Sequence, residues 1–179
     1  MARRHITRAA PREVLEVDWR LFGEMSRGLA LRVAAGFDPD LVVGIAKAGV
    51  IPGAVIASIL ERDFASMAVT RDRARARPTL VTAPPPSVTG RRVLVVDETC
   101  DTGDTLKLAL NAVRKLRPDE IKTAVSFKTG AYQPDFVGLA TSSVIILPWD
   151  REIISKGELV VRPEYAAYVP ADAAARTSV

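Results

Sequence analysis

Apolar and polar residues alternate along the chain in two different periods, which predict strands and helices in turn. Apolar positions at helical spacing predict helices over 19–35 and 105–116. Short apolar runs rich in β-branched residues predict buried strands at 41–45, 64–70, 93–96, 121–127 and 143–147. Strands that alternate with helices favour an α/β fold, with a central parallel sheet flanked by helices.

The longest apolar stretch, residues 42–60, carries a single charge, Lys47. A lysine in the middle of a membrane span is costly, and Pro52 and three glycines interrupt the run. The stretch therefore predicts a buried strand, a turn, and a helix over 50–60 that has Pro52 in its first turn. We expect no membrane partner.

Residues 71–91 break this pattern with an arginine-rich run followed by four prolines. The composition predicts an exposed loop of about twenty residues, and loops of that length in compact domains are commonly functional lids. The rest of the chain shows no boundary, so we expect a single domain over 1–179, with flexible arms at 1–12 and 171–179.

The composition of the chain limits the kinds of ligand and active site that it can have. The chain has 179 residues and a net charge of +4, compatible with an anionic ligand. One cysteine, Cys100, excludes a disulfide framework and, with no secretory signal visible, favours the cytoplasm. One histidine, His5, lies in a polar N-terminal arm, which argues against a histidine metal site or a Ser-His-Asp hydrolase.

The most informative segment is 93–106, where an apolar strand runs into Asp97 and Glu98 and then into a Thr-Gly-Asp-Thr turn at 102–105. In open α/β sheets the ligand crevice lies at the carboxyl ends of the strands. The turn offers backbone N–H groups, two threonine hydroxyls and a helix N-terminus, which suit a phosphate. Gly103 allows close approach of the backbone to the ligand.

The two acids require a different partner, because carboxylates do not bind phosphate. Asp97 and Glu98 can accept hydrogen bonds from sugar hydroxyls or hold a hydrated Mg²⁺. A phosphorylated sugar with free vicinal hydroxyls would use both the acids and the turn. The alternative is a solvated strand end with Asp104 as a simple helix cap; the ordered combination of strand, acids and turn favours the ligand.

Segment 93–106 resembles the motif that binds phosphoribosyl pyrophosphate (PRPP) in type I phosphoribosyltransferases, and 40–52 resembles the pyrophosphate loop of that family. Residues 127–138 resemble the branch specific for purines, the hypoxanthine-guanine and xanthine-guanine enzymes. Residues 148–150 resemble the hood segment of the xanthine-guanine enzymes. The resemblance covers about 19–164.

This resemblance implies a type I phosphoribosyltransferase fold with a small hood built from the terminal segments. It implies an enzyme that transfers phosphoribose from PRPP to a free purine base, most simply a 6-oxopurine. The products are a nucleoside 5′-monophosphate and pyrophosphate, and the cofactor is Mg²⁺. Family members commonly form dimers or tetramers, so a homo-oligomer is expected.

The resemblance also implies roles for individual residues. Asp97 and Glu98 would bind the ribose hydroxyls and hold Mg²⁺ through water, and Asp101 would exchange a proton with the imidazole edge of the purine. The 5′-phosphate would be held by Asp101, Thr102, Gly103, Asp104 and Thr105. Pyrophosphate would be bound by Lys47, Ala48 and Gly49, often across a cis peptide bond in this family. The base would contact Lys128, Val144 and Asp150, and loop 71–91 would close over PRPP.

Two departures from the family pattern keep alternatives open. The pyrophosphate loop has Ala48 where the family usually has glycine, and Val144 stands where an aromatic side chain usually stacks on the purine. A phosphoribosyltransferase for a pyrimidine or another heterocycle is one alternative. The other is a PRPP-binding regulator that contacts nucleic acid through the arginines of 71–77, which the low net charge and the lack of accompanying aromatics disfavour.

Overall fold

The computed structural model describes residues 13–71 and 77–169. The chain divides into two compact units. The larger unit is Arg20–Thr141, and the smaller one is built from the two terminal segments, of which 13–19 and 142–169 are described. The smaller unit is the hood that the sequence predicts from the terminal segments.

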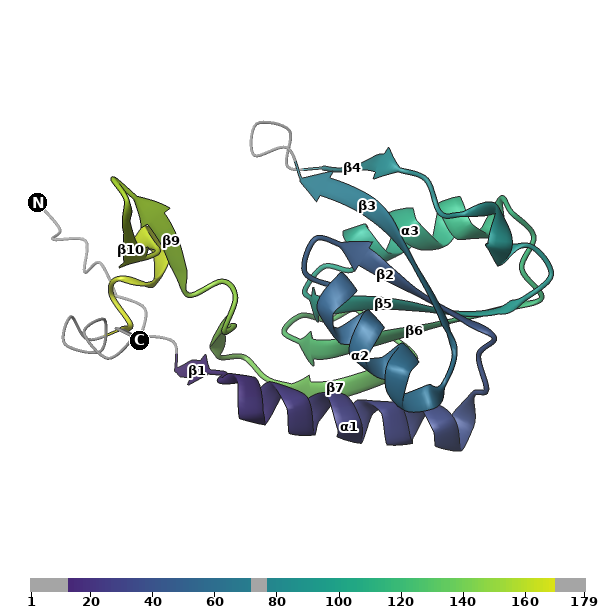
Figure 1. The fold of residues 1–179 in the computed structure, drawn as a ribbon, viewed down its shortest axis with the longest axis horizontal. Helices are drawn as coiled ribbons and strands as arrows, with labels where there is room; N and C mark the ends of the chain where they lie inside the picture. The colour runs from purple at the N-terminus through teal and green to yellow at the C-terminus, as the bar shows by residue number, and fades with distance from the viewer. Residues whose placement is uncertain (1–12, 72–76, 170–179) are drawn as a thin grey trace, which may run out of the picture. The chain divides into compact units, whose positions relative to one another are not determined.

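The larger unit is built on a six-stranded sheet with the strand order β4-β3-β2-β5-β6-β7 (Figure 1). These strands are β2 (Leu41–Ala46), β3 (Asp63–Arg71), β4 (Pro78–Thr82), β5 (Arg92–Cys100), β6 (Glu120–Lys128) and β7 (Phe136–Ala140). Neighbouring strands are parallel except for β4, which pairs antiparallel with β3 at the edge. The predicted α/β fold with a central parallel sheet is confirmed, apart from the antiparallel edge strand β4.

Three helices cover the two faces of this sheet (Figure 1). They are α1 (Trp19–Gly36), α2 (Val50–Leu60) and α3 (Asp104–Arg114). Successive side chains of a strand point to opposite faces, so β2 and β5 each contribute to two cores. Val42 and Leu94 pack with residues of α1 and α2, whereas Val43 and Val95 pack with residues of α3. The runs Leu41–Ile45 of β2 and Val93–Val96 of β5 carry no polar side chain, because both faces of the sheet are covered there.

The apolar stretch 42–60 forms a strand, a turn and a helix, as predicted. Every residue of its strand except Ala46 is buried, and its helix buries Pro52, Gly53, Ile56 and Ala57. In the part of the chain that the structure describes, no helix is both long enough and apolar enough to cross a membrane.

The prediction of one long exposed loop over 71–91 is wrong for the part that is described. Residues 78–82 form edge strand β4, and Pro86–Val88 form a 3₁₀ turn (η1) that buries Val88 completely. An edge strand tolerates a proline at its first residue, so Pro78 does not prevent pairing. Residues 72–76, at the centre of the arginine-rich run, lie outside the described residues.

In the hood, the two ends of the chain pair with each other. β1 (Val14–Glu16) is parallel to β8 (Val144–Ile146), and β9 (Glu152–Ser155) forms an antiparallel hairpin with β10 (Glu158–Val161). A short 3₁₀ turn, η2 (Pro163–Tyr165), follows. The rings of Trp19 and Trp149 lie 5.6 Å apart between centroids. The sequence predicts the strand at 143–147 but not its partner near the N-terminus.

Candidate active site

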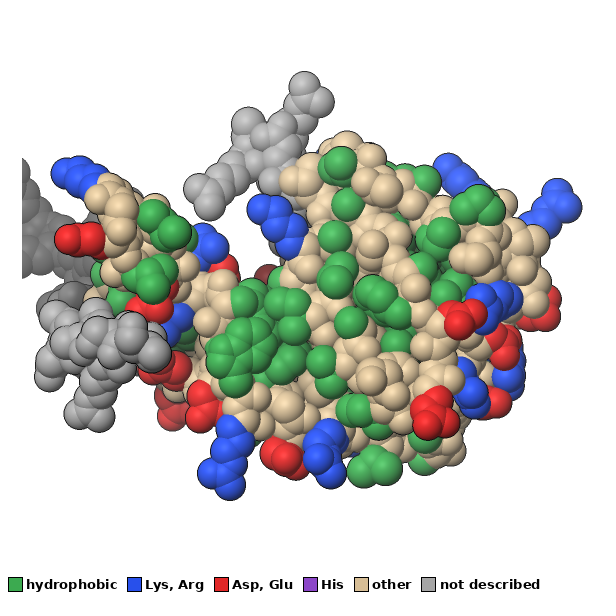
Figure 2. All heavy atoms as spheres, viewed as in Figure 1, with side chains coloured by type: hydrophobic (Ala, Val, Ile, Leu, Met, Phe, Trp, Pro, Cys, Tyr) green, Lys and Arg blue, Asp and Glu red, His purple; other side chains and the backbone are tan. Residues whose placement is uncertain are grey.

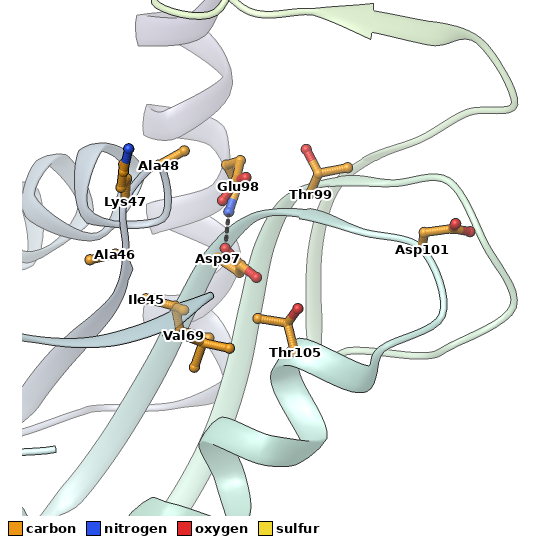
Figure 3. A pocket seen from close by; sticks show the side chains of 10 residues that line it. All are labelled: Ile45, Ala46, Lys47, Ala48, Val69, Asp97, Glu98, Thr99, Asp101 and Thr105. Carbon is orange, nitrogen blue, oxygen red and sulfur yellow. Dashed lines mark hydrogen bonds between the residues drawn. The ribbon is translucent and has the colours of Figure 1, made fainter. Parts of the chain in front are cut away.

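A cavity of about 340 Å³ opens at the carboxyl ends of β2 and β5 in the larger unit (Figure 3). Its lining comes from three neighbouring strands and the segments that follow β2 and β5: Ile45, Ala46, Lys47, Ala48, Val69, Asp97, Glu98, Thr99, Asp101 and Thr105. Ligands of open parallel sheets bind at this edge. The cavity brings together residues that the sequence assigns separately to a pyrophosphate loop, to ribose and to a phosphate turn.

Asp97 and Glu98 lie at the middle of the cavity, between Lys47 and Thr99 in Figure 3. Strand β5 continues to Cys100, past the predicted end at Val96, so both acids belong to the strand itself. Asp97 is 6% exposed, and its Oδ1 accepts a hydrogen bond from the backbone N–H of Glu98 at 3.0 Å. This contact holds the Asp97 carboxylate in one orientation toward the cavity.

Residues 47–49 connect β2 to α2, and the peptide bond between Ala46 and Lys47 is cis. Gly49 is buried against the neighbouring strand. A Cβ at this position would stand 2.8 Å from Asp97 Oδ1 and 2.7 Å from the carbonyl oxygen of Ile45. Only glycine lets the loop lie this close to the acid. The alanine at position 48 departs from the family pattern, but the glycine that the packing requires is present.

The predicted phosphate turn leads directly into α3. Gly103 has a φ of +77°, a left-handed conformation that favours glycine, and it precedes the first helical residue, Asp104. The hydroxyl of Thr102 donates to Asp104 Oδ2 at 2.9 Å. The first N–H groups of a helix lack partners within the helix and attract anions. Thr105 lines the large cavity, and Gly103 lines a smaller one beside it.

Of the other predicted phosphate ligands, Asp101 lines the cavity, whereas Thr102 and Asp104 do not. Asp101 is exposed, and it is the lining residue drawn farthest from Lys47 in Figure 3. Thr102 and Asp104 are also exposed and are not part of the lining of either cavity.

The three residues predicted to contact a base belong to different units. Lys128 ends β6 in the larger unit, whereas Val144 begins β8 and Asp150 lies between β8 and β9 in the hood. The Asp150 carboxylate pairs with Arg162 at 2.8 Å and accepts a hydrogen bond from the Tyr165 hydroxyl at 2.9 Å. Burial and this hydrogen bond to Asp150 raise the pKa of Tyr165 to about 12. The base-binding roles stay predictions.

Four residues near the cavity were not found by sequence reasoning. Thr99 and Val69 line it, Tyr132 packs on Gly103, and a Cβ on Gly130 would stand 2.3 Å from the carbonyl oxygen of Asp101. Thr99 directly follows the two acids in the sequence, so its place in the motif could have predicted that it lines the cavity. The places of the others follow only from how β3 pairs with β2 and from how the segment after β6 lies against the residues that follow β5.

Three comparisons with known proteins agree with this geometry. Residues 19–157 match the model of the phosphoribosyl transferase domain family. A purine phosphoribosyltransferase from Pyrococcus horikoshii superposes with a TM-score of 0.72 at 25% identity, over 82% of this chain and 99% of that one. A protein from Neisseria gonorrhoeae solved with bound ppGpp superposes with a TM-score of 0.68 at 22% identity, over 79% and 91% of the two chains.

The match to a curated relative covers a shorter part of the chain than the family model does. The hypoxanthine-guanine phosphoribosyltransferase of Homo sapiens is 37% identical over 57 residues, which are 29% of this chain and 26% of that protein. The chain thus spans about a quarter of the length of the curated relatives it matches. The family model, in contrast, covers most of the chain and includes all of the cavity. The chain therefore belongs to the phosphoribosyl transferase family, as its motifs indicate.

Proposed function

We propose that this protein transfers the phosphoribosyl group of PRPP to a free purine base, with a 6-oxopurine as the preferred acceptor. One observation carries the proposal: a single cavity joins the loop after β2 to the acids and the turn at the end of β5. The likeness to a purine phosphoribosyltransferase over 82% of the chain supports the purine as acceptor.

Two helix N-termini border this cavity, which fits the two anionic ends of PRPP. Helix α2 begins at Val50 directly after Lys47, Ala48 and Gly49, and α3 begins at Asp104. Each helix dipole stabilises negative charge at its N-terminus. In the proposal, pyrophosphate binds at 47–49 and the 5′-phosphate at 101–105. The ribose then lies between them, where Asp97 and Glu98 accept hydrogen bonds from its hydroxyls.

The donor set also suits Mg²⁺. Among the described residues, no three His, Cys, Asp or Glu side chains gather as a complete metal site. Mg²⁺ does not need such a cage, because it commonly binds one or two carboxylates together with water and substrate phosphates. Asp97 and Glu98 would hold it here through water molecules. When bound, Mg²⁺ neutralises charge on the pyrophosphate that leaves.

Asp101 is the proposed catalytic residue. In the reaction the bond from ribose C1 to the pyrophosphate oxygen breaks, and a bond forms from C1 to a purine ring nitrogen. The proton on the purine imidazole ring moves to the Asp101 carboxylate. Assistance of this kind is worth about 10²–10⁴-fold in rate.

The base would contact Lys128 through its exocyclic oxygen and Asp150 at the opposite edge. A carboxylate has about four acceptor positions. Arg162 and Tyr165 occupy some of the acceptor positions of the Asp150 carboxylate. The remaining positions could accept a hydrogen bond from a purine amino group. Val144 offers apolar contact without an aromatic face, and this feature favours a second candidate, a phosphoribosyltransferase for another heterocycle.

The test is pyrophosphate release from PRPP and Mg²⁺ with a panel of purines and pyrimidines. We expect turnover with at least one 6-oxopurine. Asp101→Asn should lower kcat by about 10²–10⁴-fold while PRPP still binds. Asp119→Asn, on an exposed carboxylate outside the cavity, is the matched control and should behave as the unaltered protein.

The outcomes separate the candidates. Turnover confined to a pyrimidine or another heterocycle would support the second candidate. Absence of turnover with every base, while PRPP still raises the melting temperature, would overturn the enzyme and leave a PRPP-binding regulator. The arginine cluster that such a regulator could use lies mostly outside the described residues.

A further inference from the structure

The end of β5 and the proposed phosphate loop that follows it together carry an excess of negative charge. Four carboxylates fall within residues 97–104, namely Asp97, Glu98, Asp101 and Asp104. Between Arg92 and Arg114 the sequence has one basic residue, Lys107. A phosphate that binds at the turn therefore meets several like charges and a single nearby cation along this segment.

Lys107 is held on the loop by three contacts. Its Nζ lies 3.3 Å from Asp104 Oδ1 and 3.3 Å from the carbonyl oxygen of Thr102, to which it donates a hydrogen bond. The same nitrogen lies 5.4 Å from the centroid of the Tyr132 ring, within the range of a cation–π contact. These contacts place the ammonium group of Lys107 directly over the turn that enters α3.

We propose that Lys107 is a positioning residue of the 5′-phosphate site: it neutralises Asp104 at the N-terminus of α3 and so allows the loop to accept a phosphate. This inference rests on the proposed function, because it assumes that 101–105 binds the 5′-phosphate of PRPP.

Asp104 has opposite effects in the empty and the occupied loop. A carboxylate in the first turn of a helix is stabilised by the helix dipole, and Asp104 also accepts the hydroxyl of Thr102. The same charge repels a phosphate at that N-terminus. Lys107 cancels the repulsion while it leaves the helix cap in place.

The solvent exposure of Lys107 and Asp104 determines how strongly their ion pair should affect PRPP affinity. The side chains of Lys107 and Asp104 are 54% and 50% exposed, so water and salt screen the pair. Exposed ion pairs of this kind change an equilibrium by about two- to fivefold. The effect on PRPP affinity should have that size and should shrink as the salt concentration rises.

The experiment is calorimetric titration of the whole chain with PRPP and Mg²⁺, which needs no knowledge of the base. Lys107→Gln should weaken PRPP binding by about two- to fivefold at low salt, and Asp104→Asn should strengthen it. The double variant K107Q/D104N should bind within about twofold of the unaltered protein, because the net charge of the loop is restored. Lys107→Arg, which keeps the charge, should also bind normally.

Lys122→Gln is the matched control, since it removes one ion-paired lysine near the start of β6 and changes the net charge equally. Unchanged PRPP binding by K107Q would overturn the inference. So would a double variant as weak as K107Q, because that would make the role of Lys107 independent of Asp104. If the unaltered protein binds no PRPP, the proposed function itself fails, which is a distinct result.

Discussion

The ring of Tyr132 lies directly against Gly103, so that a Cβ on the glycine would stand 2.2 Å from the ring Cγ. Tyr132 also packs against the core on the α3 side of the sheet. Through Tyr132, the segment after β6 therefore packs against the turn at the start of α3 and supports it. Gly103 is required twice, by its positive φ and by the ring that fills the space of a side chain.

Gly103→Ala should impair PRPP binding for this reason. The left-handed φ alone costs about 1–2 kcal/mol with alanine, and the collision with Tyr132 adds about 1–3 kcal/mol or shifts the turn. Gly90→Ala is a matched control, because Gly90 has a φ of +67° and nothing within 4 Å of its would-be Cβ. In thermal melts, G103A should lower the melting temperature, and the increase in melting temperature that PRPP causes, more than G90A does. Equal losses would mean that Tyr132 does not support the turn.

The loop before α2 gives a second prediction. Gly49→Ala would place a Cβ within 2.8 Å of the carbonyl oxygen of Val96 and of Asp97 Oδ1, so the loop must move away from β5. We expect a loss of about 1–3 kcal/mol in stability and a clear loss of PRPP affinity.

Ala48→Gly is the control for that variant, because it restores the usual glycine pair and only removes a methyl group. Its PRPP affinity should be no weaker than that of the unaltered protein. Titration calorimetry measures both variants, and a G49A protein that binds PRPP normally would contradict the argument.

The sequence predicts the centre of the fold well because the physical signal there is local. Val93 to Val96 is apolar on both faces, and the acids and turn follow in the same segment, so the order of residues alone places them at one edge of a parallel sheet. The contact of Tyr132 with Gly103 has no local signal. It depends on how the segment after β6 folds back on the end of β5.

Edge and hood elements were missed for a related reason. β4 follows an arginine-rich, proline-bounded run, and β1 is three residues long and pairs with β8 near the other end of the chain. Short strands that bury little surface leave a weak hydrophobic pattern. Their existence is decided by a partner strand, and the sequence does not say which one.

Asp135 has a structural role that gives a third prediction. Its Oδ2 accepts hydrogen bonds from the backbone N–H and the hydroxyl of Thr123, at 2.8 and 2.7 Å, and Thr123 is 3% exposed. Asp135→Ala leaves these buried donors without their acceptor, which should cost about 1–3 kcal/mol in the free energy of unfolding. Asp119→Ala, at an exposed site, should change it by less than about 0.5 kcal/mol. Urea unfolding measures both, and equal values would refute the role.

The start of β5 gives a prediction about pH. The Asp40 carboxylate accepts hydrogen bonds from the Arg92 side chain at 2.8 and 3.2 Å and from its backbone N–H at 2.9 Å. Arg92 lowers the pKa of Asp40 to about 2, and Arg62 and Arg92 also lower the pKa of Asp38. In the unfolded chain an aspartate has its ordinary pKa of about 3.9.

Between these two pKa values the unfolded chain binds more protons at Asp40 than the folded protein does, so stability rises with pH in that interval. The contribution of Asp40 is complete above about pH 4 and is lost as the pH falls toward about 2. Melting temperatures measured from pH 5 to pH 2 should fall, and Asp40→Asn should flatten the slope. Asp119→Asn should leave the slope unchanged. A D40N protein with the original slope would show that other carboxylates cause the acid sensitivity.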